Sequence, residues 1–360
     1  MKRRLAIGLC ACLLAAGLWG CGEEKAEEAA QQESVTVAEE EPENEGEPEN
    51  EEEPENEGET ADDADETDAQ KADTDSAEEA TEAAEDASDT EETAAAAASE
   101  SENSTSVVNY EDGQLISLDD TWQYADHSAI HTGAAVLYRA AENRKDIIIG
   151  VNAGHGTSGG SSVKTLCHPD GSAKTTGGST GAGATRAAAV SGGMTFQDGT
   201  PEKSVTLRMA QIFRDRLLAA GYDVLMLRDG DDVQLDNVAR TVICNNVADC
   251  HIALHWDGDG LSYDKGCFYI SVPDALKGME PVASHWQQHD ALGAALLAGL
   301  QNQGAAIYKN GHMSIDLTQI SYSTIPSVDM ELGNACSDHS DEALSRLADG
   351  LTEGVNGYFD

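Results

Sequence analysis

Four polar residues, far apart in this 360-residue chain, are of the types that metal-dependent hydrolases use: His155, Glu202, His255 and Glu331. Two imidazoles and one carboxylate would hold a zinc ion with a fourth position open for water, and zinc both acidifies that water and polarises a carbonyl. A second carboxylate beside the metal could take a proton from water and pass it to a leaving amine. The residue types therefore favour a metal-dependent hydrolase, a pattern that several classes of such enzymes share.

Three of the four residues lie where a predicted strand ends. Apolar runs lead into a Gly- or Asp-rich turn at each place: 147–151 before His155, 252–254 before His255 and 328–330 before Glu331. In an open α/β sheet, ligands bind in the crevice outside the carboxyl ends of the strands. Glu202 would join from the first turn of a helix, after Pro201. Taken singly, either histidine could be an ordinary hydrogen-bonded residue, and Glu202 could be there because the helix dipole favours it.

Apolar runs alternate with segments of helical periodicity throughout 106–360, which is long enough to bury one sizeable core. The predicted strands are 134–138, 146–151, 222–227, 252–254, 268–272 and 327–331, and the predicted helices are 201–220, 238–247, 286–303 and 341–358. This alternation predicts a single α/β domain with a mostly parallel sheet covered by helices on both faces.

A long Gly/Ser/Thr-rich segment, 157–200, separates His155 from Glu202. Unstructured connections of this length are uncommon in compact domains and often form lids or binding loops. A flexible surface insertion is the other interpretation, and the residue pattern does not favour either one.

The N-terminus resembles a bacterial lipoprotein signal. Basic residues 2–4 precede an apolar stretch, 5–18, that is too short for an ordinary membrane span. Leu18-Trp19-Gly20-Cys21 resembles a lipobox, so we expect 1–20 to be a signal peptide and Cys21 to be lipidated. The protein would then be held on the outer face of the cell membrane. An uncleaved signal anchor and simple secretion are the alternatives.

Residues 22–105 contain 35 Asp and Glu against two Lys, which is most of the excess in the formal net charge of −46. The sequence Glu-Pro-Glu-Asn-Glu occurs three times, starting at Glu41, Glu47 and Glu53. Such a segment buries too little apolar surface to offset its ordering entropy, so 21–105 is expected to be a disordered acidic tether. An acidic cation-binding tail is the alternative. The negative charge argues against a nucleic-acid partner.

Eight cysteines occur in the chain. Beyond the signal segment and Cys21, five remain: Cys167, Cys244, Cys250, Cys267 and Cys336. An odd number leaves at least one thiol without a partner in the chain. No Cys-x-x-Cys pair supports a cysteine zinc site, and the sequence does not determine any pairing. It does not determine the oligomeric state either.

Several short motifs, in this order, resemble the zinc-dependent N-acetylmuramoyl-L-alanine amidases of the amidase type 3 family, which includes cell-wall autolysins. They are Asn152-Ala153-Gly154-His155-Gly156, Glu202-Lys203, Leu225-Met226-Leu227-Arg228 with Arg240 and Asn246, Ala253-Leu254-His255, and 325–334 around Glu331. The resemblance covers about 146–358. It implies that His155, Glu202 and His255 bind zinc and that Glu331 is the catalytic carboxylate. The implied substrate is the amide between N-acetylmuramic acid and L-alanine of peptidoglycan.

The chain departs from the family pattern at three places. Trp256-Asp257 follow the second histidine, the insertion after His155 is unusually long, and Leu332-Gly333-Asn334 replaces a longer motif. Two other functions therefore stay open, a zinc-dependent peptidase or amidase with another substrate and an inactive wall-binding module. Arg228 and Arg240 are interpreted as structural or substrate-orienting. A cluster of acidic residues could form a solvated rim or attract cationic stem-peptide groups; it comprises Asp257, Asp259, Asp264 and Asp316.

Overall fold

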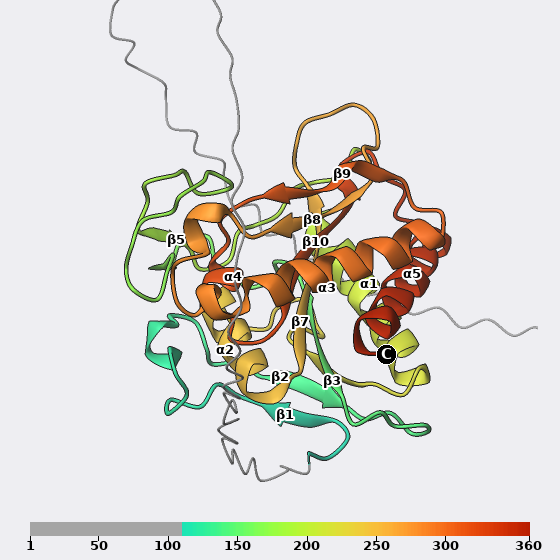
Figure 1. Cartoon of the computed structure of the whole chain (residues 1–360), viewed down its shortest axis with the longest axis horizontal. Coiled ribbons are helices and arrows are strands. Elements are labelled where there is room, and N and C mark those ends of the chain that lie inside the picture. Colours follow the sequence, from blue (N-terminus) through green and yellow to red (C-terminus); the bar gives the residue numbers. More distant parts are fainter. Residues whose placement is uncertain (1–109) are drawn as a thin grey trace, which may run out of the picture. The chain divides into compact units, whose positions relative to one another are not determined.

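The computed structural model describes residues 110–360, and this part of the chain contains all four candidate residues (Figure 1). The predicted signal peptide 1–20, Cys21 and the acidic segment up to 105 lie outside the described residues. No helix among residues 110–360 is both long and apolar enough to cross a membrane.

An eight-stranded sheet forms the centre of the domain, in the order β1-β2-β6-β3-β7-β10-β8-β9. The strands are β1 (Gln114–Ile116), β2 (Ala135–Tyr138), β3 (Ile148–Ala153), β6 (Asp223–Met226), β7 (Cys250–Asp257), β8 (Cys267–Ser271), β9 (Ile307–Ser314) and β10 (Ser327–Asn334). The four central strands, β6, β3, β7 and β10, are parallel to one another. Antiparallel pairing begins where β2 joins β6 and where β8 joins β10. The carboxyl ends of the central strands therefore meet at one edge, as expected.

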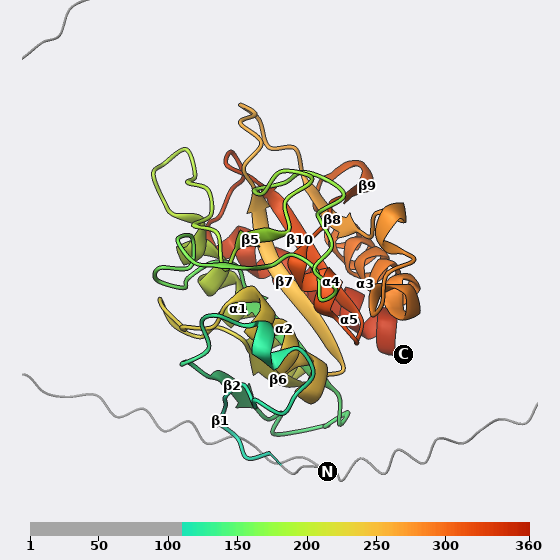
Figure 2. The same cartoon turned by 90° about the vertical axis from the view of Figure 1, so that its left-hand side faces the viewer.

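Helices cover both faces of this sheet (Figures 1 and 2). They are α1 (Glu202–Ala219), α2 (Asn237–Val247), α3 (Val282–Asn302), α4 (Thr318–Tyr322) and α5 (Asp341–Phe359). Alternation along β6 shows the two faces: Val224 belongs to the core cluster that includes residues of α1, α3 and α5, whereas Leu225 belongs to the cluster that includes residues of α2. Both side chains are fully buried, which is why β6 consists almost entirely of apolar residues. The α/β fold with helices on both faces, predicted from the alternation, is confirmed.

Two elements between α3 and β10 were not predicted, β9 and α4. The β9 sequence, IYKNGHMS, contains few apolar residues, because it is an edge strand whose side chains are mostly exposed. The helix α4 has only five residues, which is too short to show helical periodicity. Helix α3 begins at Val282, four residues before the predicted start.

The insertion 157–200 contains a separate two-stranded antiparallel sheet of β4 (Lys164–Leu166) and β5 (Arg186–Ala188). Its cysteine, Cys167, is buried. The thiols of the described cysteines are all free, so no disulfide fixes this part of the chain. The insertion is thus neither a continuation of the main sheet nor a cross-linked loop.

Candidate functional site

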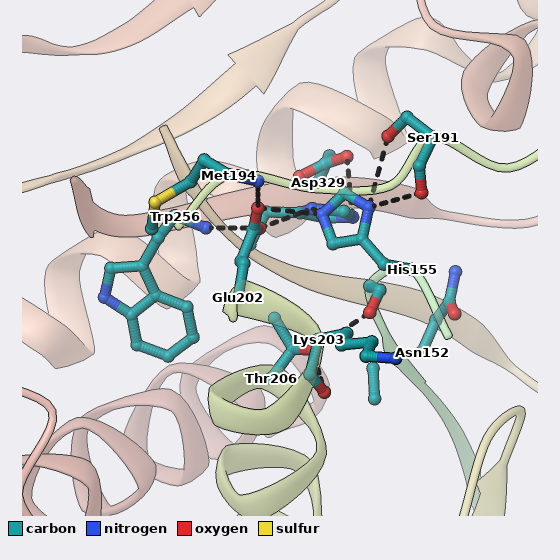
Figure 3. Close-up of polar contacts among 12 residues, drawn as sticks. Asn152, His155, Ser191, Met194, Glu202, Lys203, Thr206, Trp256 and Asp329 are labelled. Carbon is teal, nitrogen blue, oxygen red and sulfur yellow. Dashed lines mark hydrogen bonds and ion pairs between the residues drawn. The ribbon is translucent and has the colours of Figure 1, made fainter. Parts of the chain in front are cut away.

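His155, Glu202 and His255 come together at the carboxyl edge of the central strands. His155 Nε2 lies 2.9 Å from Glu202 Oε2 and 3.1 Å from His255 Nδ1. His255 Nδ1 lies 3.1 Å from Glu202 Oε1. Figure 3 shows His155 and Glu202 converging, with dashed lines marking the contacts. The structure therefore brings together the three residues that the sequence interpretation chose as ligands.

The chain reaches this point from three elements. His155 lies just beyond β3 with a left-handed backbone, φ 65°, a conformation that costs a non-glycine residue about 1–3 kcal/mol and is concentrated at functional sites. Glu202 is the first residue of α1. His255 lies within β7, which continues to Asp257, so the predicted end of that strand at 254 was too early. Gly154 is required here, because a Cβ at this position would lie 2.2 Å from His255 Cε1.

The insertion orients His155. The ring nitrogen Nδ1 lies 2.9 Å from the backbone oxygen of Ser191, and since a carbonyl oxygen only accepts, this contact places the ring proton on Nδ1. His155 Nε2 is then the unprotonated nitrogen that faces Glu202 and His255. Outer hydrogen bonds of this kind fix the tautomer of metal-binding histidines.

Both carboxylate oxygens of Glu202 accept backbone hydrogen bonds. Met194 N donates to Oε2 at 2.8 Å, and Trp256 N donates to Oε1 at 3.0 Å. Burial acts to raise the pKa of Glu202, but its close contacts with the two imidazoles of His155 and His255 outweigh it and lower the pKa below its ordinary value. Glu202 is therefore a fixed, ionised carboxylate.

Three insertion residues thus contribute to the site although no sequence signal indicated them. Ser191 and Met194 act through backbone atoms, which any residue type supplies. Gly193 has φ 80°, and a Cβ there would lie 2.8 Å from the His155 ring and 3.0 Å from Glu202 Oε2. The insertion is therefore a wall of the site rather than a free surface loop, which decides between the two interpretations left open by the sequence.

Two buried arginines, Arg228 and Arg240, donate hydrogen bonds to the backbone of the turn that contains His155. Arg228 donates to the backbone oxygens of Gly154 and Lys203, at 3.0 and 2.8 Å, and so connects this turn to the start of α1. Arg240 donates to the backbone oxygens of Ala153 and His155. Both side chains are about 1% exposed, and Arg240 is among the residues that line the cleft beside the site. Their hydrogen bonds support the structural interpretation of these residues.

Glu331 lies beside the three-residue cluster. It is the register partner of His255 in the parallel β7–β10 pair, so the two side chains leave the sheet on the same face. Its Oε2 atom is buried and has no hydrogen-bond partner among residues 110–360. Burial, together with the neighbouring Asp329, raises the pKa of Glu331 well above its ordinary value. Glu331 is thus a carboxyl group that can exchange a proton, unlike Glu202.

The site opens into a cleft of about 560 Å³. The insertion forms one side of this cleft, with Gly178, Val190 and Met194 among its lining residues, and segment 315–319 contributes to the lining as well. The insertion reaches that segment through Asp316, whose buried carboxylate accepts from His168 Nε2 at 2.9 Å and from Thr175 N at 2.7 Å. His168 therefore connects the insertion to segment 315–319 on the other side of the cleft.

The acidic cluster noted in the sequence is not a set of free charges. Lys265 pairs with both Asp257 and Asp259, and Asp264 accepts from Ser337 Oγ at 2.7 Å. Asp316 is engaged by the insertion, as described above. These contacts weigh against a strongly anionic rim that would attract cationic stem-peptide groups.

The three-residue cluster fits a zinc ion. In a tetrahedral zinc site with bonds of about 2.0–2.1 Å, neighbouring ligand atoms are about 3.3 Å apart. His155 Nε2 and His255 Nδ1 lie 3.1 Å apart, and each lies 2.9–3.1 Å from a different oxygen of the Glu202 carboxylate, which is close to that value. The donor set of two imidazole nitrogens and a carboxylate is also one that zinc uses when it keeps an open position.

Comparisons with known proteins identify the family and the fold of the chain. Residues 149–354, more than half of the chain, match the protein family described as N-acetylmuramoyl-L-alanine amidase. The crystal structure of the N-acetylmuramyl-L-alanine amidase Ami1 from Mycobacterium smegmatis has the same fold, with a TM-score of 0.50 and 19% identity over 60% of this chain and 98% of that one. The apo form of Ami1 from Mycobacterium abscessus gives a TM-score of 0.48 and 21% identity, over 60% and 99% of the two chains. A comparison with curated proteins gave no match.

Proposed function

Since the chain belongs to the family of N-acetylmuramoyl-L-alanine amidases, it is an amidase that acts on peptidoglycan, and we propose that it does so with a zinc ion held by His155, Glu202 and His255. The bond cleaved would be the amide between N-acetylmuramic acid and L-alanine. The observation that carries the zinc proposal is the convergence of His155, Glu202 and His255, whose ligand atoms, one from each residue, all lie within 4.8 Å of one another.

When bound, zinc acidifies a water molecule and polarises the scissile carbonyl. The protein supplies the remaining functions. The backbone oxygen of Ser191 holds the imidazole of His155 in the tautomer that presents Nε2, and the backbone N–H groups of Met194 and Trp256 hold the Glu202 carboxylate. These groups are fixed before substrate arrives, so little reorganisation is required during the reaction.

Glu331 would carry the proton. It takes a proton from the attacking water as the water oxygen bonds to the carbonyl carbon. The C–N bond then breaks, and Glu331 returns the proton to the amide nitrogen, which leaves as the amine of L-alanine. The partly buried position of Glu331, with its buried Oε2 atom free of hydrogen bonds within residues 110–360, supports this exchange of roles.

The location of the enzyme follows from the N-terminal segment. We propose that 1–20 is removed as a signal peptide, that Cys21 carries the lipid and that 22–105 tethers domain 106–360 outside the cell membrane. A tether of this length would let the domain reach peptidoglycan while its anchor stays in the lipid.

The proposed function is tested with protein that lacks residues 1–21. We expect about one equivalent of zinc by elemental analysis and release of stem peptides with new L-alanine amino termini from purified cell wall. Zinc without any new amino termini, on several wall types, would indicate the inactive wall-binding alternative. New termini within the stem peptide instead of at L-alanine would indicate a peptidase.

A further inference from the structure

Asp329 is an acidic residue of the cleft to which the sequence interpretation gave no role. It precedes Glu331 by two positions on β10, so both side chains leave the sheet on the same face. Asp329 lines the cleft and is only 9% exposed. Its Oδ1 atom is buried and has no hydrogen-bond partner among residues 110–360. A buried carboxylate without partners is costly, so this position calls for a partner of opposite charge or a donor.

His255 is the group that faces Asp329. Its Nδ1 atom points to His155 and Glu202, and its other nitrogen, Nε2, lies 3.8 Å from Asp329 Oδ2. Within the described chain no hydrogen bond is formed by Nε2 of this ring. A shift of about 1 Å would bring the two atoms to hydrogen-bond distance. His255 Nε2 and the Asp329 carboxylate could therefore form a hydrogen bond with each other.

The two candidate histidine ligands present opposite nitrogens. His155 uses Nε2 and is held through Nδ1 by the Ser191 carbonyl. His255 uses Nδ1, so it requires an acceptor at Nε2. A neutral imidazole carries its proton on one nitrogen only, and the acceptor at that nitrogen leaves the other one free to bind a metal.

We propose that Asp329 is a positioning residue that accepts the Nε2 proton of His255 and thereby keeps His255 Nδ1 available to the metal. The proposal rests on the zinc site proposed above. Asp329 does not touch the reacting atoms in this arrangement. It acts through His255, as the Ser191 carbonyl acts through His155.

The test compares wild type with Asp329→Leu and Asp329→Asn in protein lacking residues 1–21. Zinc affinity is measured by competition with a chelator, and the proton position on His255 by ¹⁵N NMR of histidine-labelled, zinc-loaded protein, assigned with His255→Gln. We expect Asp329→Leu to weaken zinc binding about 10–100-fold. Asp329→Asn should lose less, because its amide oxygen still accepts a hydrogen bond. The wild-type spectrum should show the proton of His255 on Nε2.

Thermal unfolding of the zinc-free proteins separates positioning from general stability. Leu removes an unpaired buried carboxylate, so zinc-free Asp329→Leu should be at least as stable as wild type although it binds zinc more weakly. Equal zinc affinity in all three proteins, or a proton on Nδ1 of zinc-loaded wild type, would overturn the role of Asp329 alone. Absence of zinc binding in wild type would overturn the proposed metal site together with it.

Discussion

Arg240 Nη2 donates a hydrogen bond of 2.7 Å to the backbone oxygen of His155, the residue that holds a left-handed conformation at the edge of the site. The same guanidinium group reaches Asn152 Oδ1, Ala153 O, Leu235 O and Thr157 Oγ1. One side chain from α2 therefore fixes the turn that presents a candidate ligand. Burial is the main cause that lowers the pKa of Arg240 to about 9. Because this value is still above neutral pH, the guanidinium group stays charged.

Arg240→Lys should weaken both folding and zinc binding. Ala153 O and Leu235 O also accept from Arg228 and Thr157, whereas Asn152 Oδ1 and His155 O have no other donor among the described residues. A lysine, with its single compact ammonium group, should leave these two without a partner. Each buried unsatisfied group costs about 1–3 kcal/mol, which predicts a loss of about 2–6 kcal/mol in the free energy of unfolding. Urea denaturation and chelator competition measure the two effects. Arg214→Lys, in a partly exposed ion pair with Asp229, is the matched control and should change neither by much.

Glu331→Gln should retain zinc and lose turnover. The amide has the shape of the carboxyl group but cannot accept the proton of water, and general-base catalysis contributes about 10²–10⁴-fold. We expect kcat to fall by that factor while zinc content stays near one equivalent. His155→Ala should show the opposite pattern, with low zinc content as the primary defect. Wild-type turnover in Glu331→Gln would remove this residue from its proposed role.

Much of the fold and the cluster of His155, Glu202 and His255 could be predicted, because apolar strands that end in polar residues are a local feature of the sequence. The contributions of Ser191 and Met194 could not, since they use backbone atoms that carry no residue identity. The alternation of side chains along a strand predicts that Asp329, two residues before Glu331, lies on the same face of the sheet. Only the structure shows that the Asp329 side chain is buried and lacks a hydrogen-bond partner for Oδ1 among residues 110–360. The edge strand β9 was missed because it buries few side chains.

Cys21→Ser should abolish lipid attachment. In bacteria that carry the intact chain, labelled palmitate should enter the wild-type protein and not the variant, and the wild type should sediment with membranes. Cys336→Ser, a substitution of a partly exposed cysteine in the folded domain, serves as control and should keep the label. Equal labelling of the wild type and Cys21→Ser would favour attachment elsewhere, and absence of label in both would favour secretion or an uncleaved anchor.

Asp316→Ala should release the insertion from the far side of the cleft. The carboxylate binds His168 and Thr175, and its loss removes the contacts that hold 168–176 in place. Hydrogen exchange in 164–188 should become at least tenfold faster, and trypsin should cut more readily after Lys164 and Arg186. If the cleft wall positions substrate, KM should rise more than kcat falls. Asp274→Ala removes an exposed carboxylate paired with Lys277 and should leave all three measurements unchanged.

Two buried histidines away from the candidate ligands should make the fold sensitive to mild acid. Burial, more than the nearby Arg240, lowers the pKa of His251 to about 3, and burial likewise lowers the pKa of His289 to about 3. In the unfolded chain these groups titrate near 6.5. The unfolded state therefore binds more protons between pH 6.5 and 3, so the stabilisation is complete above pH 6.5 and is lost as the pH falls.

At pH 5 the loss in the free energy of unfolding amounts to about 2 kcal/mol for each of the two histidines. His251→Leu should remove the part of this acid-induced loss that His251 causes. The substitution breaks no hydrogen bond, because neither ring nitrogen of His251 has a partner within the described chain, and the side-chain volumes of histidine and leucine are similar. Urea denaturation of zinc-free protein at pH 7.5 and 5 measures the change. The variant should lose about 2 kcal/mol less than wild type between the two pH values, whereas the exposed His131→Leu should follow wild type. An identical loss in wild type and His251→Leu would show that His251 titrates normally in the folded protein.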